Sequence, residues 1–294
     1  MDFLALLDQH TVVAGDGAMG SRLIARGLPA DTPGELWNLE NPDAIRQAHR
    51  TYVDAGARYV LTNTFGANTV SLARHGLEDR IEEINRAAVE NAREAAGDRA
   101  AVLGDLGPTG RLLKPIGTLS QADAREAFAR QAAALVEAGV DAFIAETFDS
   151  SAELRLALEA ARGAADLPLI ASMKFTAEDS GRYRSVMGEG PDQLVETATE
   201  VGCAVVGTNC GQGIATMIGL VGKLSAATDL PILAQPNAGS PRLEGETTVY
   251  DEGADVFAEH LPALHQNGAR IIGGCCGTTA DHVRAIRAFA DSLD

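Results

Sequence analysis

One short pattern recurs along this chain and limits what the chain can fold into. A glycine ends a helix-forming stretch, and an apolar run begins two or three residues later. The pattern occurs as DAGARYV, EAGVDAFI, EVGCAVV and NGARIIG, at residues 54–60, 137–144, 200–206 and 267–273. Glycine is typical of helix C-termini, and short runs of Val, Ile, Leu and Ala are typical of buried strands. The repeat therefore predicts units in which helices alternate with strands of a parallel sheet.

Eight apolar runs of this kind alternate with stretches that carry apolar residues at helical spacing. Strands are expected at residues 11–15, 58–62, 101–104, 142–145, 169–172, 204–207, 232–234 and 270–273. Helices are expected at residues 42–55, 121–138, 154–162 and 281–292. Ser150 and Glu153 have the spacing of a capping box before the third of these helices. Eight units in 294 residues favour a closed (β/α)8 TIM barrel over an open doubly wound sheet. No linker divides the chain, so we expect residues 1–294 to form a single domain.

The charge of the chain argues against two classes of partner. Lys and Arg number 24 and Asp and Glu number 41, which gives a net charge of −17. Nucleic acids and anionic membrane surfaces are polyanions, so we expect neither as the main partner. The sequence has neither a basic signal-peptide region nor an apolar run of about 18 residues. We therefore expect a cytoplasmic protein. In such a protein, four cysteines indicate metal binding or catalysis rather than a disulfide framework.

In a (β/α)8 barrel, the active site forms at the carboxyl ends of the strands. Residues that can carry chemistry follow the expected strands in chain order: Asp16 and Gly17, Asn63 and Thr64, Asp105, Glu146 and Thr147, Lys174, Asn209 and Cys210, Gln235 and Asn237, and Cys275 and Cys276. The fold therefore predicts that these residues gather at one end of the barrel.

Three thiols, those of Cys210, Cys275 and Cys276, belong to this set, whereas Cys203 enters a strand from the opposite end and is expected in the core. Three thiolates suit zinc and leave a fourth position open. A 2+ ion with three thiolates carries a net charge of −1, which suits it to activating a fourth thiol rather than water. We interpret the three cysteines as zinc ligands and catalytic residues. The alternatives are small buried side chains or a strained disulfide between Cys275 and Cys276.

Two carboxyl groups, those of Asp16 and Glu146, follow the first and fourth strands. They could form a general acid/base pair, cap the following helices, or bind the ammonium group of an amino-acid substrate. Beside a thiol-binding zinc, we prefer ammonium binding. The turn at residues 15–20, which contains Gly17, offers backbone N–H groups to the substrate carboxylate.

Eight motifs, GDGAMG, ELWNLENP, LTNTFGAN, GDLGPTG, ETF, GTNCG, PNAG and GGCCGTT, together resemble the homocysteine S-methyltransferase family over nearly the whole chain. The resemblance implies a (β/α)8 barrel that makes methionine from homocysteine, with zinc on Cys210, Cys275 and Cys276. It implies Asn237 as the fourth zinc ligand when substrate is absent. It also implies that Asp16 and Glu146 anchor homocysteine, and we include Gly17 and Asn209 among the substrate-binding residues.

The methyl donor is less certain from the sequence than the acceptor. TNTFGAN, GPTG and PNAG are most similar to the homocysteine-binding module of cobalamin-dependent methionine synthases. This similarity implies methylcobalamin as the donor, and because no cobalamin-binding or folate-binding module follows, we expect a separate corrinoid protein to carry it. Direct use of S-methylmethionine or betaine is the alternative, although a betaine cage needs aromatic side chains and Trp37 is the only tryptophan. Transfer to another thiol and a non-catalytic zinc-binding or thiol-binding subunit also remain open.

Overall fold

The computed structural model describes residues 1–245 and 247–294, and its main sheet contains one strand from each of the eight expected runs. These strands are β1 (Val13–Ala14), β2 (Tyr59–Leu61), β3 (Ala101–Leu106), β4 (Ala142–Phe148), β5 (Leu169–Met173), β8 (Val205–Gly213), β9 (Ile232–Asn237) and β12 (Ala269–Ile272). All their pairings are parallel. The eight predicted strands are therefore confirmed.

The sheet curves round until its first and last strands meet. Its order is β1-β12-β9-β8-β5-β4-β3-β2, so β1 and β2 lie at its two ends. The Arg58 N–H donates to the Ala14 carbonyl at 2.7 Å, and the Leu61 N–H donates to the Asp16 carboxylate at 2.9 Å. These bonds bring the ends together in a nearly closed barrel, and the predicted (β/α)8 fold class is confirmed.

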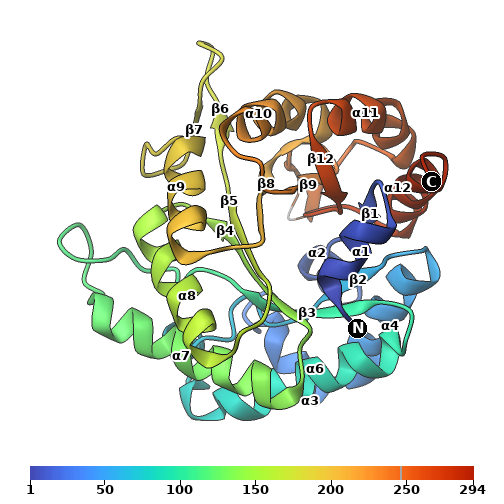
Figure 1. Cartoon of the computed structure of the whole chain (residues 1–294). Coiled ribbons are helices and arrows are strands. Elements are labelled where there is room, and N and C mark those ends of the chain that lie inside the picture. The colour runs from blue at the N-terminus through green and yellow to red at the C-terminus, as the bar shows by residue number, and fades with distance from the viewer. Residues whose placement is uncertain (246) are drawn as a thin grey trace.

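Helices surround the barrel on the outside (Figure 1). The longer ones are α4 (Pro42–Asp54), α6 (Ile81–Ala96), α7 (Gln121–Ala138), α8 (Ser151–Ala164), α9 (Pro191–Val201), α10 (Ile214–Ala227), α11 (Ala254–Gln266) and α12 (Ala280–Asp291). Short helical turns lie in the loops after β1 and β2: α2 (Gly20–Ala25), η1 (Gly34–Leu36), α3 (Trp37–Glu40), α5 (Thr69–Leu72), η2 (Ala73–His75) and η3 (Glu78–Arg80). None of the helices in the described residues combines the length and apolarity that a membrane crossing needs.

The expected capping box before α8 is wrong. Ser150 is the N-cap residue, but its side chain makes no capping hydrogen bond. The Glu153 carboxylate instead accepts hydrogen bonds from the Thr109 N–H at 2.9 Å and the Thr109 hydroxyl at 2.6 Å. Glu153 therefore ties the loop after β3 to α8, a long-range use that local spacing does not predict.

Two hairpins, which the sequence did not predict, extend the loops at the carboxyl end of the barrel. One pairs β6 (Thr176–Ala177) with β7 (Tyr183–Arg184) after β5, and the other pairs β10 (Arg242–Glu244) with β11 (Thr247–Val249) after β9. Both are antiparallel and belong to neither the barrel nor its helical layer.

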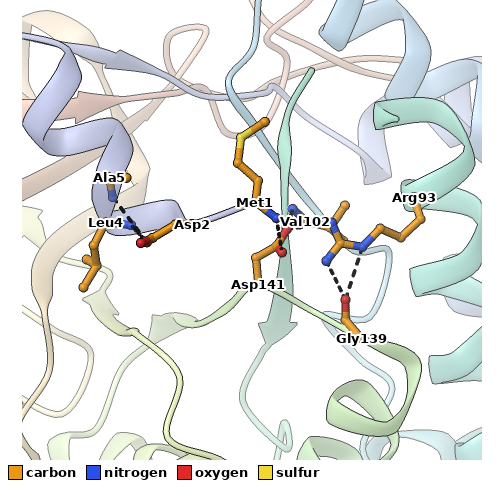
Figure 2. Close-up of polar contacts among 8 residues, drawn as sticks. All are labelled: Met1, Asp2, Leu4, Ala5, Arg93, Val102, Gly139 and Asp141. Carbon is orange, nitrogen blue, oxygen red and sulfur yellow. Dashed lines mark hydrogen bonds and ion pairs between the residues drawn. The ribbon is translucent and has the colours of Figure 1, made fainter. Parts of the chain in front are cut away.

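The amino end of the barrel is closed by α1 (Phe3–Gln9), a helix that the sequence also did not predict. The Asp2 carboxylate caps this helix by accepting hydrogen bonds from the N–H groups of Leu4 and Ala5 at 3.0 and 3.3 Å (Figure 2). Phe3 and Leu6 are buried in the apolar cluster of the barrel interior, and the Phe3 ring meets the Tyr59 ring edge-on at 5.9 Å. The helix acts as a plug that covers the apolar interior of the barrel at its amino end.

Asp141 is a paired carboxylate at this amino end. It contacts the Met1 ammonium group at 2.7 Å and the Arg93 guanidinium at 2.7 Å, and it accepts a hydrogen bond from the Val102 N–H at 2.8 Å (Figure 2). Burial alone would raise the pKa of Asp141, but Arg93, the ammonium group and the N–H together hold it below its usual value.

Candidate active site

The barrel interior has an apolar layer, formed by one or two residues from every strand. These residues are Val13, Tyr59, Ala101, Leu103, Ala142, Ile144, Ile170, Val205, Leu233 and Ile271. Because side chains of a strand alternate between its two faces, the residue two positions further on also points inward. At those positions the chain has Asp105, Glu146, Ser172 and Gln235, together with Leu61 and three glycines. A polar layer therefore lies directly above the apolar one.

Tyr59 reaches from the apolar layer into this polar layer. A Cβ atom on Gly15 would lie 2.2 Å from the Tyr59 hydroxyl, and one on Gly273 would lie 3.1 Å from it. Only glycine at these two positions leaves room for the ring. The glycine that follows β1 is thus explained by packing against Tyr59, and the one that follows β12 also lies close to Asp16 and Gln235.

Above the polar layer lies a cavity of about 390 Å³, at the carboxyl ends of the strands. Six of the residues predicted for the site line it together: Asp16, Gly17, Glu146, Cys210, Cys275 and Cys276. Glu35, Thr62, Asn63, Thr64, Phe65 and Asp105 also line it. No Lys, Arg or His belongs to this lining within the described part of the chain.

The three thiols form a compact cluster in the cavity wall. The Sγ atoms of Cys210, Cys275 and Cys276 all lie within 4.8 Å of one another, and those of Cys275 and Cys276 are 4.0 Å apart. Hydrogen bonds from Cys275 and Cys276 lower the pKa of Cys210 well below its usual value. The hydrogen bonds to Cys210 in turn raise the pKa of Cys275 and Cys276, so the cluster favours one thiolate, on Cys210.

The donor set and its spacing fit zinc. Tetrahedral zinc with Zn–S bonds of about 2.3 Å holds its sulfur ligands about 3.8 Å apart. Asn237, the residue expected as a fourth ligand, lies on β9 and has a buried side-chain oxygen without a hydrogen-bond partner in the described residues. It does not line the cavity, but the adjacent Ala238 N–H donates to the Cys276 carbonyl at 2.9 Å.

The carboxyl groups of Asp16 and Glu146 are buried without a basic partner. Burial raises the pKa of Asp16 to about 8, against the opposing effect of the hydrogen bond from the Leu61 N–H. Burial, together with the nearby charges of Cys210 and Asp16, raises the pKa of Glu146 to about 8. A cation that enters the cavity would stabilise the ionised form of both groups.

Asn209 differs from its expected place in the substrate site. Its side-chain oxygen accepts hydrogen bonds from the Thr147 N–H at 2.9 Å and the Ser172 hydroxyl at 2.7 Å. Its amide group donates to the Glu146 carboxylate at 2.7 Å and to the Thr147 hydroxyl. All four of its hydrogen-bonding positions are used, and it is buried outside the cavity lining. The geometry makes Asn209 a positioning residue for Glu146, rather than a direct contact of a ligand.

Asn209 also contacts the two residues of the site that have unusual backbone angles. Thr147 and Cys210 have φ angles of 61° and 59°, and they are the only non-glycine residues with positive φ in the described chain. Such a conformation is unusual for a β-branched residue and persists only where surrounding contacts hold it. The side-chain bonds of Asn209 hold Thr147, and its backbone is joined directly to Cys210.

The turn after β1 is held rigidly beside the thiols. The Ala18 N–H donates to the Thr278 hydroxyl at 3.0 Å, which in turn donates to the Cys275 carbonyl at 2.7 Å. The N–H groups of Gly17 and Met19 have no partner among the described residues. The Ala18 N–H is already bonded to Thr278. Of the N–H groups expected to bind the substrate carboxylate, those of Gly17 and Met19 therefore remain.

Two further expectations concern residues outside the cavity. Cys203 is 6% exposed and packs in the core between the sheet and the helices, and burial raises the pKa of its thiol to about 12. Its predicted place in the core is confirmed. Trp37 begins α3, is half-buried and does not line the cavity, so the one tryptophan does not contribute to an aromatic cage there.

The chain is similar in sequence to known methyltransferases. A sequence model of the family described as homocysteine S-methyltransferase matches residues 13–290. The methionine synthases of Mycobacterium tuberculosis and Mycobacterium leprae are 32% and 31% identical to the chain, over 99% and 98% of its length. The chain spans about a quarter of the length of these two relatives, 26% and 25%.

Solved structures of a homocysteine methyltransferase have the same architecture. The metallated form of Escherichia coli MmuM superimposes with a TM-score of 0.79 at 26% identity, covering 97% of this chain and 98% of that one. The oxidised form of the same protein gives a TM-score of 0.80 at 27% identity, with the same coverage.

Proposed function

The chain belongs to the homocysteine S-methyltransferase family, and from this premise we propose that it is a zinc-dependent methyltransferase that converts homocysteine to methionine. We propose that residues 1–294 act as one homocysteine-binding domain. One observation carries the proposal: three thiols within 4.8 Å of one another share a cavity with two buried carboxyl groups that have no basic partner. The thiol cluster suits the sulfur of the substrate, and the carboxyl groups suit its ammonium group.

In the proposed mechanism, Cys210, Cys275 and Cys276 would hold the zinc, and Asn237 would be the fourth ligand in the absence of substrate. When bound there, zinc would lower the pKa of the homocysteine thiol and keep its sulfur nucleophilic. Asp16 and Glu146 bind the ammonium group and so fix the direction of the sulfur. The N–H groups of Gly17 and Met19 receive the carboxylate.

We propose methylcobalamin, presented by a separate corrinoid protein, as the methyl donor. Six of the nine exposed large apolar residues in the described chain stand on loops at the carboxyl end of the barrel: Ile24, Phe65, Leu112, Ile116, Val186 and Leu243. Each belongs to a loop that follows a barrel strand, and exposed apolar side chains on such loops can contribute to a protein-docking surface. This surface favours a protein-bound donor over S-methylmethionine or betaine, which need no docking.

A donor panel tests the proposal. Reduced, zinc-loaded protein is given homocysteine with free methylcobalamin, S-methylmethionine or betaine, and methionine formation is measured. We expect turnover with methylcobalamin and little or none with the other two. Strong turnover with S-methylmethionine or betaine would contradict the corrinoid route but keep the methyltransferase. No methionine with any donor, together with tight binding of another thiol, would favour a different acceptor.

The Cys276→Ser variant tests the zinc site, with Cys203→Ala as the matched control. We expect Cys276→Ser to lose bound zinc and to lose activity by about 1000-fold or more, while circular dichroism shows an intact barrel. Cys203 lies in the core away from the cluster, so Cys203→Ala should retain one zinc per chain. Full activity in zinc-free Cys276→Ser would contradict the proposal.

A further inference from the structure

A third carboxyl group, that of Asp105, faces the cavity beside Asp16 and Glu146. Leu103 of β3 belongs to the apolar layer, so Asp105, two residues later, points to the same side. It lines the cavity and is 4% exposed. Its backbone is fixed: the N–H donates to the Thr62 hydroxyl at 3.0 Å, and the carbonyl accepts from the Thr64 hydroxyl at 2.7 Å.

The side chain of Asp105 has no donor to satisfy it. Its Oδ1 atom is buried without a hydrogen-bond partner in the described residues, and so is Oε1 of Gln235, which also lines the cavity. Buried acceptors of this kind are rare in folded proteins and call for a donor from a ligand or an ordered water. The lining holds four acidic residues and, among the described residues, no basic one, so a cation must arrive with the ligand.

The fourth lining acid, Glu35, lies on the η1 turn in the loop after β1 and not at the end of a barrel strand. Its carboxylate accepts a hydrogen bond from the Gly66 N–H at 2.6 Å. Asp16, Asp105 and Glu146 stand at the carboxyl ends of barrel strands, and we assign these three carboxyl groups to the ligand, although Asp16 and Glu146 each also accept one hydrogen bond within the chain. A primary ammonium group has three N–H donors, one for each of these carboxyl groups.

We propose that Asp105 is a specificity-determining residue that completes, with Asp16 and Glu146, a three-carboxyl pocket for an unsubstituted ammonium group. The inference rests on the proposed function, and it narrows the acceptor to thiols that carry a primary amine. Burial and the charges of Glu146 and Asp16 raise the pKa of Asp105 well above its usual value. The empty pocket thus holds protons that a bound ammonium group would displace.

Equilibrium binding to zinc-loaded, reduced protein tests this pocket with three probes. Homocysteine has the full ammonium group, N-methylhomocysteine has one N–H fewer, and 4-mercaptobutanoate has the thiol and carboxylate without an amine. We expect the wild-type protein to bind homocysteine about 10- to 100-fold more tightly than either analogue. This comparison needs no variant, so it does not depend on how a substitution affects folding.

The Asp105→Asn variant then assigns the effect to one residue, with Glu35→Gln as the matched control on the same wall. We expect Asp105→Asn to weaken homocysteine binding about 10-fold or more while the Kd of 4-mercaptobutanoate changes less than about 3-fold. Glu35→Gln should leave the homocysteine Kd within about 3-fold.

The outcomes separate this inference from the function on which it rests. Tight homocysteine binding that Asp105→Asn leaves unchanged would overturn the role of Asp105 but keep the methyltransferase. Equal binding of homocysteine and N-methylhomocysteine by the wild-type protein would do the same. Binding of neither homocysteine nor 4-mercaptobutanoate would overturn the proposed function, and this inference with it.

Discussion

The two ends of the barrel treat buried carboxyl groups in opposite ways. At the amino end, Asp141 is paired with two cations and an N–H, and its pKa is held below the usual value. At the carboxyl end, Asp16, Asp105 and Glu146 line a cavity that has no basic side chain within the described chain, and their pKa values are raised. The first arrangement is complete in the folded chain, whereas the second requires a ligand.

This difference separates stability from function in one molecule. Pairing a buried charge within the chain favours the folded state at neutral pH, whereas an unpaired carboxyl group disfavours it. Phe3 and Leu6 of α1 cover the amino end of the barrel interior, so this end contributes to stability. The open end retains groups that weaken the empty protein and strengthen its complex with a cation.

The largest loss of stability is expected for Asn209→Ala, because the hydrogen bonds of Asn209 at the carboxyl end are all made within the chain. Asn209→Ala would remove the partners of the Glu146 carboxylate, the Thr147 N–H and the Ser172 hydroxyl. We expect the free energy of unfolding to fall by about 3 kcal/mol, because several buried groups lose their bonds. We also expect weaker zinc binding, measured by chelator competition.

The control for Asn209 is Asn85, which is also buried but lies away from the cavity. Its amide group donates to the carbonyls of Ala67 and Ile81 at 2.9 and 2.8 Å. Asn85→Ala should lose stability in urea unfolding but keep the zinc affinity of the wild type. Equal zinc affinity in both variants would show that Asn209 has no special role at the carboxyl end.

An intermediate effect is expected for Asp16→Asn. Burial raises the pKa of Asp16 to about 8, so the folded chain binds a proton that the unfolded chain loses near pH 4. This contribution to stability is present below about pH 4 and is lost as the pH rises towards 8. In metal-free protein, the unfolding free energy of the variant should fall less steeply than that of the wild type between pH 5 and 8.

The same variant should weaken homocysteine binding to zinc-loaded protein about 10- to 100-fold. Urea unfolding across the pH range and equilibrium binding measure the two effects separately. An unchanged pH slope would mean that Asp16 is already ionised in the empty site, and the contrast between the two ends would then be lost.

The smallest effect, with the opposite dependence on pH, is expected for Asp141→Asn at the amino end. Because the folded pKa of Asp141 is lowered, its contribution to stability is present above about pH 4 and is lost as the pH falls through the folded value. We expect a loss of about 1–2 kcal/mol at pH 7, since Arg93 is partly exposed, and no loss at low pH. Homocysteine binding should not change, and a weaker affinity would contradict the division between the ends.

Much of the fold could be predicted from the sequence, because each barrel strand is a short apolar run beside a helix-forming stretch. All eight barrel strands follow from that pattern. The plug α1 does not, because only Phe3 and Leu6 mark its buried face, and its value depends on the barrel end that it covers. The capping box failed for a related reason: Glu153 is bonded to Thr109, 44 residues away in the chain.

The composition of the site could be predicted better than the roles within it. Strand ends alone gather Asp16, Glu146 and the three cysteines in one cavity. Position along a strand does not tell whether a side chain faces the ligand or supports a neighbour, which is why Asn209 was expected in the substrate site. The pairing of Ala18 with Thr278 brings together residues that are 260 positions apart, and no local signal marks it.

The stacking of a polar layer on an apolar one has a consequence for how this barrel can change. Along the same strands, a residue of the polar layer follows a residue of the apolar layer two positions later. A library that varies only Asp105, Glu146 and Gln235, three members of the polar layer that line the cavity, would leave the residues of the apolar layer unchanged. New acceptor preferences could thus be selected at three codons without altering the layer around which the strands pack.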